Sequence, residues 1–119
     1  MAIEGVRSGL PYQALDRLQK AAGLNQAEIA TVVGIPERTI VRRKSEGRLT
    51  PTESDRVDRI TRLLELATKV LEDEEKARSW LHRPNRGLAG KTPLELLDTD
   101  RGVRTVEDIL MRIEHGIYG

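Results

Sequence analysis

Basic side chains are concentrated in one short stretch of the chain, between Pro36 and Thr50. The stretch contains five arginine and lysine residues against two glutamates, a local charge of +3 in a chain whose net charge is +1. Arginine can donate two hydrogen bonds to the O6 and N7 atoms of guanine, and arginine or lysine pairs with phosphate. The stretch therefore has the chemistry for binding a nucleic acid, unless its charges form only the solvated face of a helix.

Two short helices joined by a tight turn would position these side chains. Asn25 is a good N-cap for a helix over Gln26–Val33, and Gly34 permits a sharp turn after it. Pro36 would occupy the first position of a helix that continues to about Glu46. This pattern is typical of a helix-turn-helix. Its inward positions would be filled by β-branched residues, namely Ile29, Val33, Ile35 and Ile40.

The basic stretch divides into two groups of expected contacts with DNA. The residues expected to read base edges lie near the start of the recognition helix or one turn further on, and they are Arg38, Thr39 and Arg42. The residues expected to contact the phosphate backbone are Arg43, Lys44 and Arg48, with Gln26 as an anchor at the start of the preceding helix. Because one such module buries little surface, we expect a dimer on two half-sites about one helical turn apart.

A second distinctive stretch surrounds Trp80, the one tryptophan of a chain that has no phenylalanine. Pro84 and Asn85 should end a helix there, because proline cannot donate to the helical ladder. Thr92–Glu95 has the composition of a capping box and should begin another helix, over Pro93–Leu97. The stretch is either a small packed domain or a docking surface. In the packed alternative, three side chains would fill a core between the two helices: Trp80, Leu81 and Leu88.

The remaining pattern predicts further helices and therefore an all-α fold. We expect Met1–Leu10 to form a mobile arm. Helices are predicted over 11–22, 51–71 and about 73–82. A polar turn, Asp98–Gly102, precedes a final amphipathic helix that ends at Gly116. Thr50–Glu53 has the composition of a second capping box and should begin the long helix. This helix carries apolar residues at positions 57, 60, 64, 67 and 71 and a second seam at 63, 66 and 70. One seam could pack on a partner, or both could form one wide core-facing stripe.

The composition argues against several classes of protein. There is no cysteine, which excludes disulfides, a thiol nucleophile and a cysteine zinc site. The sequence has only two histidines and no phosphate loop, HExxH pair or serine elbow, so we expect no catalytic residues, metal or cofactor. No run approaches the about 20 apolar residues of a membrane span, and Met1–Leu10 lacks the apolar core of a secretory signal. We expect a cytoplasmic protein without a membrane partner.

Two parts of the sequence resemble known families. The pattern Gln26-x-x-x-Ala30-x-x-x-Gly34-x-x-x-x-x-Ile40 resembles the helix-turn-helix of the Cro and lambda-repressor (Xre) group, over about 15–49. A second pattern is Ala77-x-x-Trp80-Leu81-x-x-Pro84-Asn85-x-x-Leu88-x-Gly90-x-x-Pro93-x-Glu95-Leu96-Leu97, followed by Gly102, Val106 and Arg112-Ile113-Glu114-x-Gly116. With these residues, the chain over roughly 74–119 is similar to the toxin-binding domain of Xre/MbcA/ParS-type antitoxins.

The resemblance implies an antitoxin that neutralises a RES-domain, NAD-depleting toxin and represses its own operon by binding operator DNA. It implies a homodimer within a larger toxin–antitoxin hetero-oligomer, associated with the nucleoid when it is bound to the operator. The domains expected are an arm and helix-turn-helix over 1–50, a connecting or dimerisation helix over 51–72 and a toxin-binding domain over 73–119. The alternative is a freestanding, dimeric helix-turn-helix regulator with a C-terminal dimerisation or ligand-sensing domain.

The residues expected to contact the toxin lie in two places. One group surrounds the loop and consists of Trp80, Pro84, Asn85 and Leu88. The other is the tail, Gly116, Ile117, Tyr118 and Gly119, which could enter the toxin near its NAD pocket. Each has a structural alternative, because Trp80 could belong to the core, Pro84 and Asn85 could simply form the loop, and the tail could be frayed.

Overall fold

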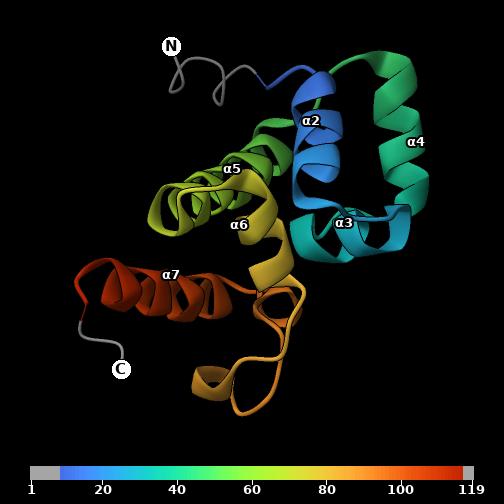
Figure 1. Cartoon of the computed structure of the whole chain (residues 1–119). Helices are drawn as coiled ribbons and strands as arrows, with labels where there is room; N and C mark the ends of the chain where they lie inside the picture. Colours follow the sequence, from blue (N-terminus) through green and yellow to red (C-terminus); the bar gives the residue numbers. More distant parts are fainter. Residues whose placement is uncertain (1–8, 117–119) are drawn as a thin grey trace. The chain divides into compact units, whose positions relative to one another are not determined.

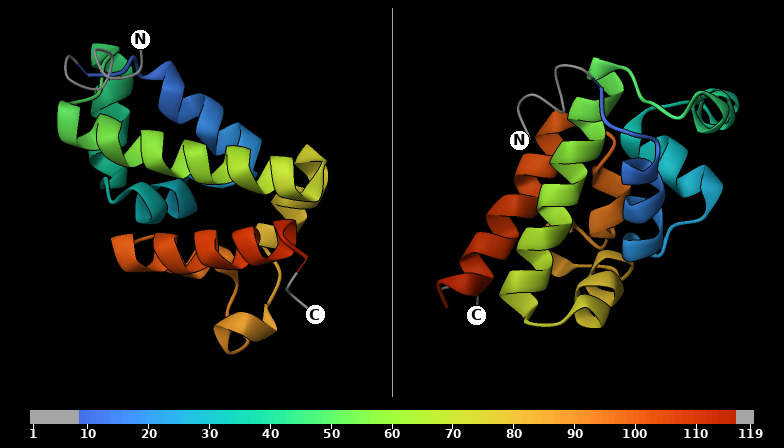
Figure 2. Two further views of the ribbon diagram at one scale, coloured as in Figure 1. Left: turned by 90° about the vertical axis from the view of Figure 1, so that its left-hand side faces the viewer. Right: turned by 90° about the horizontal axis from the view of Figure 1, so that it is seen from above.

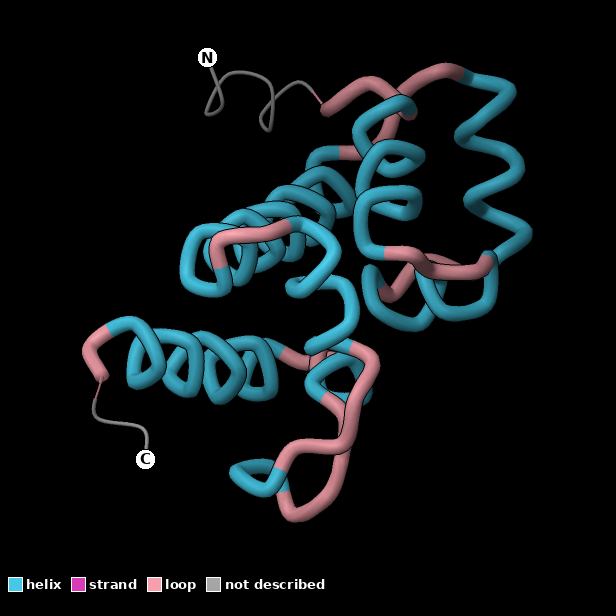
Figure 3. Tube along the Cα trace, in the orientation of Figure 1, coloured by secondary structure: helices cyan, strands magenta, loops and turns pink. Residues whose placement is uncertain are grey.

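The computed structural model describes residues 9–116, which form helices joined by short connections (Figure 1). The helices are α2 (Gln13–Ala22), α3 (Gln26–Val33), α4 (Glu37–Glu46), α5 (Pro51–Leu71), α6 (Glu74–Leu81) and α7 (Asp100–Glu114), with 3₁₀ helices η1 (Arg86–Leu88) and η2 (Pro93–Leu96). The all-helical fold is confirmed, and Figure 3 shows helices and connecting loops but no strand among the described residues. Two compact units divide within α5, between Thr61 and Arg62.

Local capping explains where the helices of the first unit begin and end. Asn25 and Glu28 form a capping box at the start of α3, and Gly34 ends that helix in the left-handed conformation with φ of 66°. Pro36 is the N-cap of α4 and not its first residue, because its ψ of 145° is extended. The helix-turn-helix that the sequence predicts is thus present, with α4 beginning one residue later than expected.

The segment before α2 is tied to the segment after α4. Pro11 and Arg48 form an isolated antiparallel bridge, and the amide of Leu49 donates to the carbonyl of Leu10 over 2.9 Å. The Leu10 amide donates to the hydroxyl of Ser54, which is fully buried. Residues 9 and 10 are therefore held in place, unlike the mobile arm predicted for Met1–Leu10, whose first eight residues lie outside the described part. Because this bridge uses the backbone at Pro11, α2 begins at residue 13 and not 11.

Aliphatic side chains fill the core of the first unit. The four inward positions predicted for the helix-turn-helix are all confirmed, since Ile29, Val33, Ile35 and Ile40 are at most 2% exposed. Leu15 of α2 is also fully buried. Burial of each such side chain contributes about 1.5–3 kcal/mol, and none of the buried core side chains of this unit is aromatic.

The long helix α5 confirms the predicted bounds and the capping box at its start. The amide of Thr50 donates to Glu53 Oε1 over 2.9 Å, and the amide of Glu53 donates to Thr50 Oγ1 over 3.2 Å. Its buried apolar residues form one stripe that draws on both predicted seams: Val57, Ile60, Leu63 and Ala67. Residues along the flanks of the stripe are half-buried, namely Leu64, Leu66, Val70 and Leu71.

In the second unit, residues 62–71 of α5 run beside α7 in both views of Figure 2. The Lys69 ammonium lies 3.9 Å from the Glu114 carboxylate across this pair. The predicted capping box of Thr92 and Glu95 is present, but it begins the single 3₁₀ turn η2 and not an α-helix. The predicted polar turn at 98–102 is wrong, because α7 already begins at Asp100 under the cap of Thr99. Among the described helices, none has the length and apolar character needed to cross a membrane.

Candidate functional site

Helix α4 carries five of the seven residues predicted to bind DNA, and three of these five are exposed. Arg38, Arg42 and Lys44 are all exposed there, whereas Thr39 is half-buried on the flank of the helix. Arg38 and Arg42 are four residues apart, so they lie one above the other on one side of the helix. Ile40 is buried on the opposite side and determines which way α4 faces. The fold therefore brings two arginines together on the outer face of the second helix of the helix-turn-helix.

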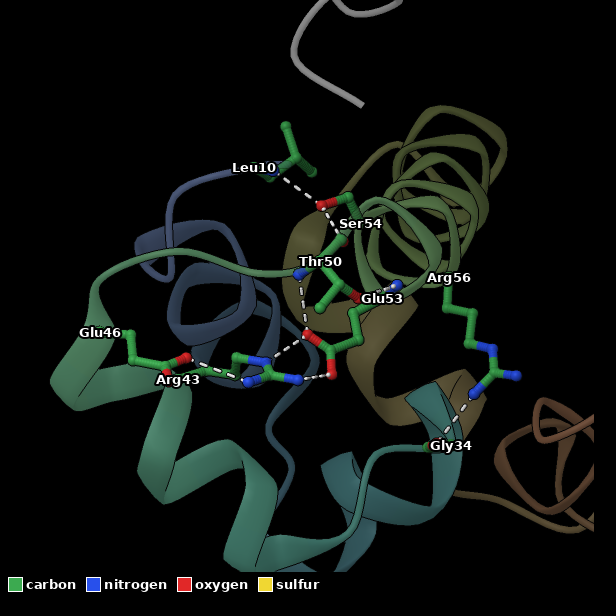
Figure 4. Close-up of polar contacts among 8 residues, drawn as sticks. All are labelled: Leu10, Gly34, Arg43, Glu46, Thr50, Glu53, Ser54 and Arg56. Carbon is green, nitrogen blue, oxygen red and sulfur yellow. Dashed lines mark hydrogen bonds and ion pairs between the residues drawn. The ribbon is translucent and has the colours of Figure 1, made fainter. Parts of the chain in front are cut away.

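Arg43, which the sequence predicted as a phosphate contact, is paired with two carboxylates within the first unit. Figure 4 shows its guanidinium turned toward the start of α5, where Nε and Nη2 donate to the two carboxylate oxygens of Glu53 over 2.7 and 3.0 Å. Nη1 donates to Glu46 over 3.0 Å. The side chains of Arg43 and Glu53 are only 15% and 12% exposed. This paired arginine fixes α4 against α5, and its guanidinium is occupied by the two carboxylates.

Glu53 joins the N-cap of α5 to this ion pair. Burial by itself would raise the pKa of the Glu53 carboxyl, but the hydrogen bonds from the Arg43 side chain and the Thr50 amide outweigh it and lower that pKa below its ordinary value. The hydrogen bonds that Arg43 donates to Glu53 and to Glu46 raise the pKa of Arg43 further above its ordinary range. Both groups therefore remain charged near neutral pH, and the orientation of α4 depends on them.

The lowered pKa predicts a stability that is lost in acid. Because the carboxyl of Glu53 has a lower pKa in the folded chain than in the unfolded chain, its contribution is present above the unfolded value of 4.5 and disappears as the pH falls through the folded value. We expect the difference in unfolding free energy between the native chain and Glu53→Gln to shrink from pH 7 to about pH 3. Urea unfolding followed by circular dichroism at a series of pH values measures this difference.

A matched variant separates this ion pair from a general effect of carboxylates. Glu37→Gln removes an exposed carboxylate from the first turn of α4, the helix that carries Arg43. If the two variants showed the same pH dependence, the pairing of Glu53 with Arg43 would not be its cause.

The other two predicted DNA contacts lie in the first unit but outside α4. Gln26 is exposed at the first position of α3. Arg48 is exposed beyond the end of α4 and donates from Nη1 to the carbonyl of Gly9 over 2.7 Å. Sequence reasoning did not single out two further exposed residues of α4, Val41 and Ser45. Their spacing of three and seven residues from Arg38 was the signal that could have placed them on the same face.

The second unit contains a cavity of about 270 Å³ beside the loop that follows α6. It is lined by Trp80, Arg83, Pro84, Asn85 and Arg86. Trp80 is half-buried, so the expectation that it fills the core is only partly met, whereas Leu81 and Leu88 are buried at 2% and 7% exposure. Leu88 thus supports the loop from inside. The surface open to a partner is formed by the indole, the exposed Pro84 and the arginine side chains.

Asn85 organises the loop through its own hydrogen bonds. Its side chain accepts from the Gly87 amide over 2.8 Å, and its backbone amide donates to the Lys91 carbonyl over 3.0 Å. The 3₁₀ turn η1 that results was not predicted. Gly116 is exposed after α7 with φ of 70°. The other predicted tail contacts, Ile117, Tyr118 and Gly119, lie outside the described residues.

The two units together define a class of binding protein, a helix-turn-helix unit followed by a small helical unit. Residues 1–62 match the Antitoxin Xre-like helix-turn-helix domain, and residues 66–116 match the Antitoxin Xre/MbcA/ParS C-terminal toxin-binding domain. The chain therefore belongs to the Xre/MbcA/ParS family of antitoxins. Members of this family are antitoxins and not enzymes, as the sequence predicted.

Individual proteins with similar sequences or structures are consistent with this family membership. The chain is 34% identical over 118 residues to Antitoxin Xre of Yersinia enterocolitica, covering 98% of this chain and 80% of that protein. It is 37% identical over 114 residues to Antitoxin Xre of Photorhabdus laumondii, with coverage of 94% and 77%. A chain in the crystal structure of the M. tuberculosis MbcT–MbcA toxin–antitoxin complex has the same fold, with a TM-score of 0.66, 19% identity and coverage of 91% and 96%.

Proposed function

We propose that this chain neutralises a RES-domain, NAD-depleting toxin through its C-terminal unit and represses its own operon by binding operator DNA through its helix-turn-helix. The observation that carries this proposal is that the helix-turn-helix match and the toxin-binding match cover separate stretches, 1–62 and 66–116. The proposed site of action is the cytoplasm, and the nucleoid when the operator is occupied. The structural relative from a toxin–antitoxin complex supports the proposal at the level of the fold.

The proposed DNA surface is the outer face of α4. Arg38 and Arg42 would read base edges, with Thr39 beside them, because the exposed face of a recognition helix enters the major groove. Lys44, Arg48 and Gln26 would contact phosphates around it. The pairing of Arg43 with Glu53 supports this arrangement, since it fixes the direction in which the two exposed arginines point.

The proposed toxin surface combines the Trp80 cavity with the tail. A half-buried indole beside an exposed proline offers a rigid apolar contact area, which is typical of energetically important interface residues. The tail, 116–119, would enter the toxin near its NAD pocket. Under this proposal Leu88 and Asn85 act mainly by shaping the loop that carries the cavity.

We further propose a homodimer, in which the region 51–72 serves as the connecting and dimerising helix. The half-buried leucines and valine on the flanks of the α5 stripe offer apolar area for such contacts. Two protomers would occupy two operator half-sites. Analytical ultracentrifugation of the chain at micromolar concentration tests this, and a monomer both with and without the toxin would contradict it.

Co-expression with the RES-domain toxin tests the proposed neutralisation. The native chain is expected to restore growth and the cellular NAD content. A chain that ends at His115 is expected to lose most of this protection and to keep operator binding. Arg38→Ala, which alters an exposed side chain of the first unit, is the matched control. This variant should keep the protection against the toxin and bind the operator more weakly.

The proposed role of the tail and the proposed antitoxin role can each fail separately in this experiment. Full protection by the chain that ends at His115 would show that the tail is not needed. No protection by the native chain would contradict the antitoxin role toward RES-domain toxins and favour a freestanding regulator. Loss of both activities in the shortened chain would indicate that the deletion disturbs folding, which its circular dichroism spectrum reports.

A further inference from the structure

Val41 is the more exposed of the two large hydrophobic residues that stand out on the surface of residues 9–116. Its exposed fraction is 59%, compared with 39% for Met111. A single exposed aliphatic residue is common in soluble proteins, so exposure alone carries no conclusion. Its position on the recognition helix is what makes it informative.

Val41 shares the outer face of α4 with both candidate base-reading arginines. It follows Arg38 by three residues and precedes Arg42 by one, so it lies about 60° and 100° around the helix from them. All three side chains are exposed. Ser45, one turn further along, lies on the same exposed face.

Two contacts on the opposite side prevent α4 from rotating to bury Val41. Ile40 is 2% exposed, and Arg43 is held by two hydrogen bonds to Glu53. The close-up in Figure 4 shows Arg43 directed toward Glu53, away from the exposed face. The aliphatic side chain is therefore presented to solvent by the same contacts that present the arginines.

The chemistry of this face matches one feature of the major groove. The two neighbouring guanidinium groups favour the polyanionic backbone of DNA over an apolar protein partner. Within the major groove the apolar group displayed by the bases is the C5-methyl of thymine. Valine is β-branched and has one strongly preferred rotamer in a helix, so its methyl groups are already positioned for such a contact.

We propose that Val41 reads sequence by packing against the C5-methyl group of a thymine in each operator half-site. This inference rests on the proposed operator binding and adds a specificity-determining residue to it. Loss of one buried methyl contact is expected to weaken binding about fourfold for each half-site. Two half-sites would then give an effect of about fifteenfold.

The test compares DNA with and without thymine methyl groups. The segment immediately upstream of the coding sequence is amplified once with dTTP and once with dUTP, and the full-length chain is titrated with each at one salt concentration. The native chain should prefer the thymine DNA, and Val41→Ala should lose most of that preference. Val41→Thr keeps one methyl group and should retain much of the preference for thymine DNA. Met111→Ala removes the other exposed hydrophobic residue and should retain the full preference for thymine DNA.

Comparing the variants isolates the contribution of Val41. Uracil also changes the shape of the duplex and any other thymine contacts, but these effects are common to all variants and cancel in the ratio of affinities. A full thymine preference in Val41→Ala would overturn the inference and leave operator binding intact. If the native chain bound the upstream segment no better than unrelated DNA, operator binding would fail and the inference with it.

Discussion

Replacing Gly102 by alanine is expected to lower the free energy of unfolding of the second unit by about 3 kcal/mol. Gly102 is buried in the first turn of α7. A Cβ atom there would overlap the carbonyl oxygen of Leu96 and lie 2.7 Å from its carbonyl carbon. The obstacle is the backbone of η2, which cannot rotate away as a long side chain can. The substituted chain must therefore separate α7 from η2.

Trp80 provides a local probe for this experiment, because it lies in the same unit as Gly102. Its fluorescence during urea unfolding reports that unit even if the two units unfold separately. Gly87→Ala is the matched control, since Gly87 is exposed in η1, where the backbone angles suit any residue. The control should match the native midpoint closely. A native midpoint for Gly102→Ala as well would show that α7 and η2 can shift apart at little cost.

Local signals in the sequence were sufficient for most of the helix boundaries. Asn25, Gly34 and the Thr50–Glu53 pair act through atoms within four residues of themselves, so their types and spacing predict the caps that the structure contains. The all-helical fold and the helix-turn-helix follow from these signals together with the apolar spacing. These features required no knowledge of contacts between distant parts of the chain.

Gly102 shows where local reasoning fails. Glycine has a low helix propensity, so the sequence favoured a turn before the final helix. The reason for glycine at this position is the close approach of Leu96, which belongs to another element. The same holds for Leu10, whose partner Ser54 lies 44 residues away. Such contacts are set by packing and leave no periodic signal near the residue itself.

The candidate DNA site was predictable as a region but not residue by residue. Arg42 and Arg43 are adjacent and chemically identical, and composition assigns both to DNA. Their positions around the axis of α4 distinguish them, because Arg43 follows the buried Ile40 by three residues and therefore points inward. Its partner Glu53 also serves the cap of α5, which the sequence did identify. The hydrogen bonds that join Arg43 to this capping residue appear only in the folded chain.

Arg38→Ala is expected to weaken binding to the operator by about 1–3 kcal/mol, while binding to unrelated DNA changes little. A bidentate contact with guanine is lost at one base pair, whereas the phosphate contacts that support binding to any sequence remain. Arg38 is exposed, so the unfolding midpoint should not change. Anisotropy titrations with an upstream duplex and an unrelated duplex at the same salt concentration measure the difference. An equal loss on both would contradict base reading by Arg38.

The neighbouring residues Arg43 and Lys44 provide the sharpest controls, because the structure predicts opposite responses for them. A side chain that neutralises a phosphate contributes about 0.9 to the slope of log Kobs against log salt concentration. Lys44→Ala should reduce the slope by about that amount for each bound protomer and leave stability unchanged. Arg43→Ala should keep the native slope, because its guanidinium is paired with Glu53 and Glu46, and should lower the unfolding midpoint. A reduced slope with native stability in Arg43→Ala would instead show that Arg43 leaves its carboxylate partners to contact phosphate.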